Sequence, residues 1–388
     1  MTAPITGVPA GEKRPRVMML GLRGIPDVQG GVEKHVEELS HHFAEKGWDV
    51  EVIGRKPYLG NSISYTWKGI RVLPLWAPRS MKFEAIVHTA LGVFVAAWRR
   101  PDILHIHAIG PALLTPLARL MGLKVVVTHH GYDYDRQKWN RFAKLILKLG
   151  EGAGMRFANR RIAVSNDIAR TMEKRYGVAM QFVPNGVAVR RGSANTRVLE
   201  KFGLEPRRYI IMVARIVPEK RQHDLIAAFA RLDDPSVKLV LVGSAEYTAS
   251  YAQDVRKLAE ETPGVILTGV QTGDDLAGLF DNAGLFVLPS SHEGMPIALL
   301  EAMGYGLPVL ASDITANLEI GLPAEDYFPL GNIDELAAAL RRKLAKPFSE
   351  ANASLQNSHV EKEYGWPQIS DRTLRVYQEI RKPPRWQD

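Results

Sequence analysis

Residues 285–305 read LFVLPSSHEGMPIALLEAMGY, and this stretch decides the predicted fold. The apolar run Leu285–Leu288 predicts a buried strand, and the apolar run after Pro296 predicts a helix. Proline is favoured at the first helical position because its missing N–H would have no partner there. The turn before the helix presents backbone N–H groups, and the helix dipole adds about half a positive charge. Gly294 allows close approach because it has no Cβ. The stretch therefore predicts an anion seat, which we define as residues 293–297.

Two carboxylates flank the predicted anion seat, Glu293 just before the helix and Glu301 inside it. Five helical residues and the turn separate them by roughly 8–12 Å. That distance is too long for a carboxylate pair acting on one bond, but it suits the two ends of a nucleotide sugar, with the diphosphate over the helix end. In the alternative, Glu293 is exposed to solvent and Glu301 only caps a neighbouring loop.

A second candidate segment is Ala214–Lys220, where a buried strand ends beside Arg215 and a helix is expected after Pro218. Lys220 falls in the first turn of that helix, where the dipole disfavours a cation. A diphosphate held between Arg215 and Lys220 would explain its position. The alternative is a Lys220 that points into solvent and an Arg215 that pairs with a surface acid.

Two further motifs follow predicted strands of the first half. The pair Gly30-Gly31 stands directly before a helical pattern and could approach the same diphosphate, although a glycine pair is more often only a turn. The tandem pair His129-His130 precedes Gly131 at the end of a strand. A histidine there can hydrogen-bond a sugar hydroxyl or a developing charge, or it can be structural.

Along the whole chain, short β-branched runs alternate with amphipathic runs, which is typical of βαβ units and parallel sheets. The predicted strands are Arg16–Gly21, Asp49–Gly54, Ile70–Leu75, Asp102–His107, Lys124–Thr128, Arg161–Val164, Tyr209–Ala214, Lys238–Val242, Val265–Leu267, Leu285–Leu288 and Pro308–Ala311. The predicted helices are Val32–Lys46, Phe83–Trp98, Pro111–Met121, Lys138–Phe157, Glu219–Ala230, Ala249–Glu261, Asp274–Asp281, Pro296–Tyr305, Asp334–Lys343 and Tyr364–Ile380.

These patterns predict two Rossmann-like, doubly wound α/β domains that face a cleft, where such sheets bind ligands at their carboxyl ends. We expect domains at 1–190 and 208–363, a linker at 191–207 and a terminal helical segment at 364–388. A dinucleotide-binding domain with NAD chemistry is disfavoured. The first strand is followed by Gly21-Leu22-Arg23-Gly24-Ile25-Pro26, which is not G-x-G-x-x-G.

The composition of the chain restricts the site chemistry and the cellular compartment that we expect. The 388 residues include no cysteine, which removes thiolate metal sites and cysteine nucleophiles and suits a reducing compartment. Residues 1–16 lack the apolar core of a signal peptide. The most apolar run, Phe83–Trp98, contains Glu84 and His88 and is shorter than the roughly 20 residues of a membrane span. We therefore expect a cytoplasmic protein and a buried helix at 83–98.

The net charge of +8 is concentrated in one segment, residues 136–161, which contains eight basic residues and the single acid Glu151. The basic residues are Arg136, Lys138, Arg141, Lys144, Lys148, Arg156, Arg160 and Arg161. The expected helix carries an apolar stripe of Trp139, Phe142, Ile146 and Leu149. A basic amphipathic helix of this kind favours an anionic membrane surface, and a core-packed helix with a solvated basic face is the alternative. The chain shows no known nucleic-acid-reading motif, so nucleic acid is disfavoured as a partner.

Together these segments resemble glycosyltransferase family 4, retaining enzymes of the GT-B fold. The resemblance covers nearly the whole chain. It rests on the two glutamates with the Pro-Ser…Glu-Gly-Met-Pro…Leu-Leu-Glu-Ala-Met…Gly-x-Pro-Val sequence around them, on Arg215-x4-Lys220, on Pro184-Asn185-Gly186-Val187 and on Gly30-Gly31. The chain departs from the family pattern at Arg221, which stands where glycine is frequent, and at Ala316-Asn317, which replaces a common Gly-Gly.

The resemblance implies roles for individual residues. Glu301 would hold the ribose, Arg215 and Lys220 the diphosphate, and Val270 would lie beside the base. Glu293 would hold the donor sugar together with the segment Gly294, Met295, Pro296 and Ile297. His130 would match the histidine near the reacting carbon, with His129 competing for that assignment. The resemblance also implies that the helix from Trp366 crosses back to the first domain.

The resulting hypothesis is a retaining glycosyltransferase that moves a sugar from a nucleotide-sugar donor onto a saccharide or lipid-linked saccharide, as in polysaccharide assembly. Stabilisation of the leaving diphosphate by Arg215, Lys220 and the helix end would make a metal unnecessary. No Asp-x-Asp motif occurs in the candidate site. Two alternatives remain, a sugar-nucleotide epimerase of similar fold and a nucleotide-sugar-binding protein without turnover.

Overall fold

The computed structural model describes residues 13–28, 30–60, 63–79, 83–135, 140–189, 196–244, 249–346 and 348–381. The chain divides into two compact units. The first comprises Met1–Gly186 and Trp366–Asp388, and the second comprises Val187–Gly365. Each unit is described separately below.

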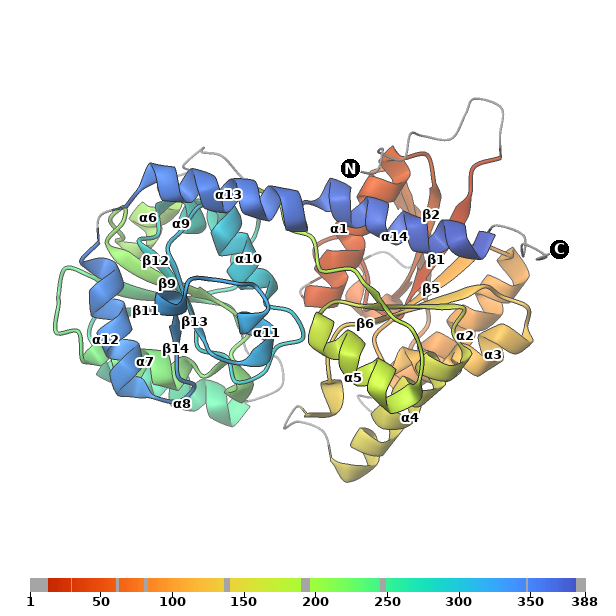
Figure 1. Cartoon of the computed structure of the whole chain (residues 1–388), viewed down its shortest axis with the longest axis horizontal. Coiled ribbons are helices and arrows are strands. Elements are labelled where there is room, and N and C mark those ends of the chain that lie inside the picture. The colour runs from red at the N-terminus through yellow and green to blue at the C-terminus, as the bar shows by residue number, and fades with distance from the viewer. Residues whose placement is uncertain are drawn as a thin grey trace. The chain divides into compact units, whose positions relative to one another are not determined.

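The first unit contains an eight-stranded sheet in the order β3-β4-β2-β1-β5-β6-β7-β8, parallel except for the antiparallel pair β3–β4 (Figure 1). Its strands are β1 (Arg16–Leu20), β2 (Asp49–Arg55), β3 (Tyr65–Trp67), β4 (Ile70–Leu75), β5 (Ile103–His107), β6 (Val125–His129), β7 (Arg160–Ala163) and β8 (Gln181–Phe182). From β1 the chain adds β2 and β4 on one side and later β5 to β8 on the other. The strand order therefore reverses between β1 and β5, the position where doubly wound sheets bind ligands.

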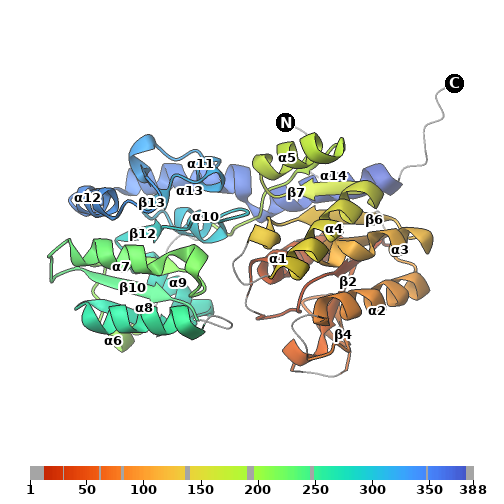
Figure 2. The same cartoon turned by 90° about the horizontal axis from the view of Figure 1, so that it is seen from below.

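Helices cover both faces of this sheet, which explains why β1 is buried from Val17 to Leu20 rather than alternating. The helical segments are α1 (Gly31–Glu45), η1 (Lys56–Tyr58), α2 (Glu84–Arg99), η2 (Pro111–Leu114), α3 (Thr115–Leu120), η3 (Asp133–Asp135), α4 (Arg141–Phe157), α5 (Asn166–Tyr176) and α14 (Trp366–Arg381). Helices α1 and α14 pack together in one apolar core with Val17 and Met19. Helices α2, α3 and α4 lie side by side (Figures 1 and 2).

The second unit contains a six-stranded parallel sheet in the order β11-β10-β9-β12-β13-β14. Its strands are β9 (Tyr209–Val213), β10 (Lys238–Val242), β11 (Val265–Gly269), β12 (Leu285–Leu288), β13 (Val309–Ser312) and β14 (Tyr327–Phe328). From β9 the chain adds β10 and β11 on one side, then β12 to β14 on the other. The order reverses between β9 and β12, so the loops that follow these two strands meet at one edge.

Both faces of the second sheet are also covered by helices, with α7, α8 and α12 on one side and α6, α9 and α10 on the other (Figure 1). The helical segments are α6 (Arg197–Phe202), η4 (Pro218–Lys220), α7 (Gln222–Ala230), α8 (Ala249–Glu261), α9 (Gly273–Asn282), α10 (Ile297–Gly304), α11 (Thr315–Leu318), η5 (Ala324–Asp326), α12 (Ile333–Leu344) and α13 (Glu350–Tyr364).

Every strand and helix expected from the sequence has a counterpart, but several boundaries differ. The expected helix at 219–230 is divided into η4 and α7 because Arg221 has a positive φ of 53°, which a continuous helix does not allow. The helix expected from Pro296 begins at Ile297, and Pro296 is its N-cap. The expected linker at 191–207 contains α6, which belongs to the second unit. The terminal segment expected from residue 364 begins in the first unit at Trp366.

The expected buried helix at 83–98 corresponds to α2, whose Phe94 and Trp98 are exposed although His88 and Val93 are buried. Among the described residues, no helix has both the length and the apolar character needed to cross a bilayer.

Candidate active site

The loops after β9 and β12 are joined by hydrogen bonds at the carboxyl edge of the second sheet. Both the backbone N–H and the hydroxyl of Ser291 donate to the carbonyl of Glu219, at 2.9 and 3.2 Å. Ser291 lies two residues before Glu293, and Glu219 lies one before Lys220. These bonds therefore bring the two predicted donor-binding segments together, at the point where the strand order reverses.

Lys220 forms an ion pair with Glu293. The two side chains are only 18% and 10% exposed, so solvent screens the pair weakly. The alternatives in which Lys220 points into solvent and Glu293 is fully exposed are therefore wrong. The pair places one cation beside the carboxylate that the resemblance assigns to the donor sugar, at the N-terminal side of α10.

The anion seat has a local geometry that differs from the expected one. Because Pro296 is the N-cap, its carbonyl accepts the N–H groups of Leu299 and Leu300 at 3.1 and 3.2 Å. No side chain caps this helix end. Met295 and Pro296 are buried, whereas Gly294, Ile297 and Glu301 are partly exposed. The seat therefore combines an apolar floor with partly accessible groups at a helix N-terminus.

A glycine that the sequence analysis missed supports Arg215. A Cβ on Gly243 would lie 1.9 Å from the carbonyl oxygen of Ala214, so only glycine allows the loop after β10 to contact the end of β9. The next residue accepts a hydrogen bond from the N–H of Ile216 at 3.0 Å. The side-chain amide of Gln222 donates to the carbonyl of Arg215 at 2.8 Å. In the sequence, this contact could have been expected from the Gly243-Ser244 dipeptide that directly follows the apolar strand Lys238–Val242.

Asn317, one of the two residues that depart from the family pattern, has a structural role at the same edge of the sheet. The Asn317 amide donates to the carbonyl and the hydroxyl of Ser312, at 2.9 and 3.0 Å. The Ser312 hydroxyl in turn donates to the carbonyl of Ser290 at 2.5 Å. All three residues are buried. The asparagine thus fixes the end of β12 from which the anion seat starts. Val270, predicted to lie beside the base, is 45% exposed directly after β11.

In the first unit, the space beside Gly30 is occupied by an ion pair between Arg23 and Glu33, with 3.1 Å between Nε and Oε1. A Cβ on Gly30 would lie 2.0 Å from the Glu33 carboxylate. This close approach explains the glycine structurally, and its expected role toward the diphosphate stays a prediction. Gly31 is exposed at the first position of α1.

The two tandem histidines have different surroundings. His129 is fully buried, and its Nδ1 accepts the N–H of Gly131 at 3.2 Å. Its proton is therefore on Nε2, which donates to Glu151 at 3.2 Å. Both nitrogens of His129 are thus engaged in the interior. His130 is partly exposed.

Glu151, the single acid of the basic segment, is the centre of a buried hydrogen-bond network. Its carboxylate also accepts hydrogen bonds from Tyr134, Arg175 and Tyr176 at 3.0, 2.7 and 2.8 Å. Burial alone would raise the pKa of Glu151, but the hydrogen bonds from His129 and Tyr176 outweigh it and lower this pKa to about 2. The carboxylate therefore stays ionised.

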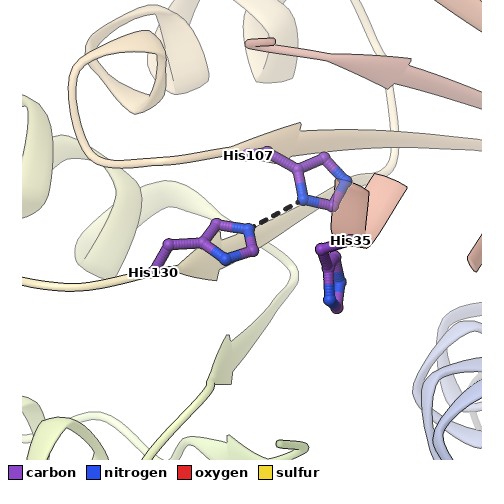
Figure 3. Close-up of side chains that lie close together, drawn as sticks. All are labelled: His35, His107 and His130. Atoms are coloured by element: carbon purple, nitrogen blue, oxygen red, sulfur yellow. Dashed lines mark hydrogen bonds between the residues drawn. The ribbon is translucent and has the colours of Figure 1, made fainter. Parts of the chain in front are cut away.

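His130 belongs to a histidine cluster with His35 and His107 (Figure 3). His107 is the last residue of β5, His130 follows β6, and His35 lies on α1, so the cluster is at the switch point of the first sheet. Nδ1 of His107 and Nε2 of His130 are hydrogen-bonded at 3.1 Å. Burial, reinforced by the neighbouring imidazoles His105 and His129, lowers the pKa of His130 to about 3. Its ring is therefore neutral at physiological pH.

The exposed face of α4 differs from the expected stripe. Phe142, Leu145 and Leu149 are 68%, 54% and 55% exposed. Ile146 is partly buried, and Trp139 lies outside the described residues. The second half of α4 packs tightly on η2, since a Cβ on Gly150 would lie 2.2 Å from the carbonyl of Ile109. The alternative of a core-packed helix therefore holds only for this second half.

Comparison with known proteins shows to which family this chain belongs. Residues 29–191 match the sequence family described as Glycosyltransferase Family 4, and residues 196–359 match the one described as Glycosyl transferases group 1. Together the two matches span most of both units. The chain is a glycosyltransferase of the family 4 type.

Relatives of this glycosyltransferase include lipid-modifying enzymes. A UDP-Gal:alpha-D-GlcNAc-diphosphoundecaprenol alpha-1,3-galactosyltransferase of Escherichia coli is 28% identical over 260 residues, which are 62% of this chain and 66% of that protein. A phosphatidyl-myo-inositol mannosyltransferase of Mycolicibacterium smegmatis is 25% identical over 91% of both chains.

Solved structures show the same GT-B fold. Sucrose-phosphate synthase of Thermosynechococcus elongatus has a TM-score of 0.81 at 20% identity, covering 95% of this chain and 99% of the other. Anabaena Alr3699/HepE, solved in complex with UDP-glucose, has a TM-score of 0.73 at 18% identity, covering 94% and 99%. The family matches and the sequence relatives support a transferase.

We predict that Glu151→Gln lowers the free energy of unfolding of the first unit by about 2–4 kcal/mol, because the amide cannot replace a buried carboxylate with four hydrogen-bonding partners. All seven tryptophans belong to the first unit, so tryptophan fluorescence during urea unfolding measures this unit alone. Glu379→Gln is the matched control. It breaks the exposed pair with Arg160 and should cost less than about 1 kcal/mol. Equal effects of both substitutions would contradict the prediction.

Proposed function

We propose that this enzyme transfers a sugar, with retention of anomeric configuration, from a nucleotide-diphosphate sugar to a saccharide or lipid-linked saccharide. The observation that carries the proposal is the largely buried Lys220–Glu293 pair beside the N-terminal end of α10. A cation and a carboxylate at one helix end suit the two chemically different parts of this donor, its phosphates and its sugar hydroxyls.

We propose for the donor the residue roles that the family resemblance implies. Arg215 and Lys220 hold the diphosphate together with the backbone of residues 294–297, and Glu293 accepts hydrogen bonds from sugar hydroxyls. Glu301, farther along α10, accepts from the ribose, and Val270 contacts the base. Relatives and structural neighbours are named for UDP-sugars and for GDP-mannose. They therefore leave the base and the sugar open.

The proposed step is a front-face substitution. The bond between the anomeric carbon and the leaving phosphate oxygen breaks, and the acceptor oxygen forms a bond to the same face of that carbon. The acceptor's proton passes to an oxygen of the departing diphosphate. Arg215, Lys220 and the helix end stabilise the negative charge as it develops. Because these groups supply the positive charge, we propose that no metal is required.

His130 is the proposed first-unit contact to the donor. Its neutral ring at physiological pH can donate or accept one hydrogen bond at a sugar hydroxyl without adding a full charge. We propose His130, not His129, because both nitrogens of His129 already have partners in the interior.

The direct test is incubation with UDP-, GDP- and ADP-sugars, with and without a synthetic polyprenyl-diphosphate monosaccharide. We expect a glycosylated product with one donor, with the anomeric configuration of that donor retained, and no conversion of the donor sugar without acceptor. Addition of EDTA should leave the rate unchanged. Epimerised donor in the absence of acceptor would contradict transfer, and loss of activity in EDTA that Mg²⁺ restores would contradict the leaving-group mechanism.

We predict that Arg215→Ala and Lys220→Ala each weaken the binding of the corresponding nucleoside diphosphate by about 10–100-fold, because each removes a charge-assisted contact. Isothermal titration calorimetry measures this affinity. Lys257→Ala, which removes a 75% exposed cation from the same unit, should leave it unchanged. Glu293→Gln should impair transfer but retain nucleoside diphosphate affinity, because Glu293 is assigned to the sugar. Equal affinities of K220A and K257A would end the donor assignment.

We propose a lipid-linked acceptor and a peripheral position at the cytoplasmic face of the membrane. The first half of α4 exposes three large apolar side chains beside the cations Arg141, Lys144 and Lys148, a combination that suits an anionic lipid surface. A cavity of about 630 Å³ opens next to it, lined by tyrosines, by the cations Lys148 and Arg175 and by the carboxylates of Asp135, Glu151 and Asp167. Aromatic and polar side chains of this kind suit a saccharide. Two relatives are named for lipid acceptors.

We predict that the protein floats with liposomes containing anionic lipid at low salt and less so at high salt, because salt screens the basic side chains. Replacing Phe142, Leu145 and Leu149 by serine should abolish flotation. Leu355→Ser, at an equally exposed leucine of α13, is the control and should float like the unmodified protein. Failure of the unmodified protein to bind at low salt would contradict the membrane proposal and leave the donor assignment intact.

A further inference from the structure

Three histidines from separate parts of the first unit converge on one point. His35, His107 and His130 each place a ring nitrogen within 4.8 Å of the others (Figure 3). The ring centroid of His35 is 5.1 Å from that of His130 and 5.8 Å from that of His107. The sheet edge positions His107, at the end of β5, and His130, after β6, and helix α1 places His35 beside them.

Two nitrogens of the cluster are buried without a hydrogen-bonding partner among the described residues, Nδ1 of His35 and Nε2 of His107. Both side chains are at least nine-tenths buried, with relative exposures of 4% and 0%. An unsatisfied buried polar group costs about 1–3 kcal/mol. The unsatisfied Nδ1 of His35 can therefore take a further partner, whereas the His107 nitrogen that meets His130 is Nδ1, which is already hydrogen-bonded to it.

The neighbouring His105 shows that this interior can satisfy an imidazole completely. Both nitrogens of His105 are bonded at 2.6 Å, to Tyr377 and to Thr128. His35, His107 and His130 instead converge on one another, and two of them carry an unsatisfied nitrogen.

We propose that His35, His107 and His130 form a binding site for a divalent transition-metal ion of the Zn²⁺ and Ni²⁺ class. Imidazole suits these ions, and three histidines with one open position are a recurrent ligand set. Bonds of 2.0–2.1 Å place tetrahedral ligand nitrogens about 3.4 Å apart. His107 and His130 are already at 3.1 Å, so closing the site requires a movement of roughly 1–1.5 Å by His35. The partly exposed His130 leaves an entry path and room for water as fourth ligand.

Occupancy of this site has a consequence that rests on the proposed function. A metal bound to His130 engages the ring that we assign to the donor sugar. The ion is therefore inhibitory, in agreement with a transfer step that needs no metal. Binding itself does not depend on that assignment.

Binding can be measured without activity because Trp366 lies near the cluster. Its ring centroid is 5.7 Å from that of His35, so Ni²⁺ at the site should quench tryptophan fluorescence. The experiment uses the full chain stripped of metal, titrated with Ni²⁺, with Zn²⁺ as competitor. His35→Gln, His107→Gln and the partly exposed His130→Gln should each weaken the apparent affinity by at least about tenfold, since loss of even an outer-shell partner costs that much.

A surface pair provides the matched control. His41 and His42 both contact Glu45, and the His42 ring also lies near Trp366. His41→Gln/His42→Gln should leave quenching unchanged if the metal binds the buried cluster. Quenching abolished by this double substitution, or retained in a folded His130→Gln protein, overturns the proposal. Circular dichroism checks the fold of each variant.

Inhibition is tested separately, as the ratio of transfer rates with and without Zn²⁺. We expect a lower ratio for the unmodified enzyme and a ratio near one for His35→Gln. Metal binding without inhibition would leave the site in place and contradict the role of His130. Absence of both binding and inhibition would end this inference but not the proposed transfer reaction.

Discussion

The hydrogen bonds from Ser291 to the carbonyl of Glu219 are the constraint on which the candidate donor site depends. They join the loops of two strands that are neighbours in the sheet but distant in the chain. The reversal of strand order between β9 and β12 brings these loops together, and the small side chain of Ser291 lets them touch. Without this contact, Lys220 and Glu293 would have no reason to meet, because each lies on a different loop.

In the first unit, too, two loops meet where the strand order reverses, but they carry different side chains. There the reversal lies between β1 and β5, and Gly21, with a φ of 106°, brings the loop after β1 against the end of β5. A Cβ on it would lie 2.3 Å from the carbonyl of His107. The second unit uses the corresponding edge to gather charges at a helix end. The first gathers neutral imidazoles, which its buried interior keeps unprotonated.

Sequence patterns predicted those elements whose position depends on neighbouring residues in the chain. Apolar runs located the long strands, and Pro296 located the start of α10 to within one residue. Two- and three-residue strands such as Tyr65–Trp67 and Gln181–Phe182 were missed because they are too short to show a period. Helix α13 was missed because only Val360 and Tyr364 of its fifteen residues are buried. The histidine cluster joins residues that only the sheet topology brings together, so no local pattern could indicate it.

The buried position of Glu151 also changes how the charge of its segment should be counted. In the sequence this acid offsets one of the surrounding cations. In the structure its carboxylate is fully buried and paired with Arg175, which lies outside the segment. Arg141, Lys148 and Arg156 therefore face solvent without compensation from it. The field that a membrane or an anionic acceptor would meet at α4 is thus more positive than the composition of residues 136–161 indicates, because a charge neutralised in the interior contributes little outside.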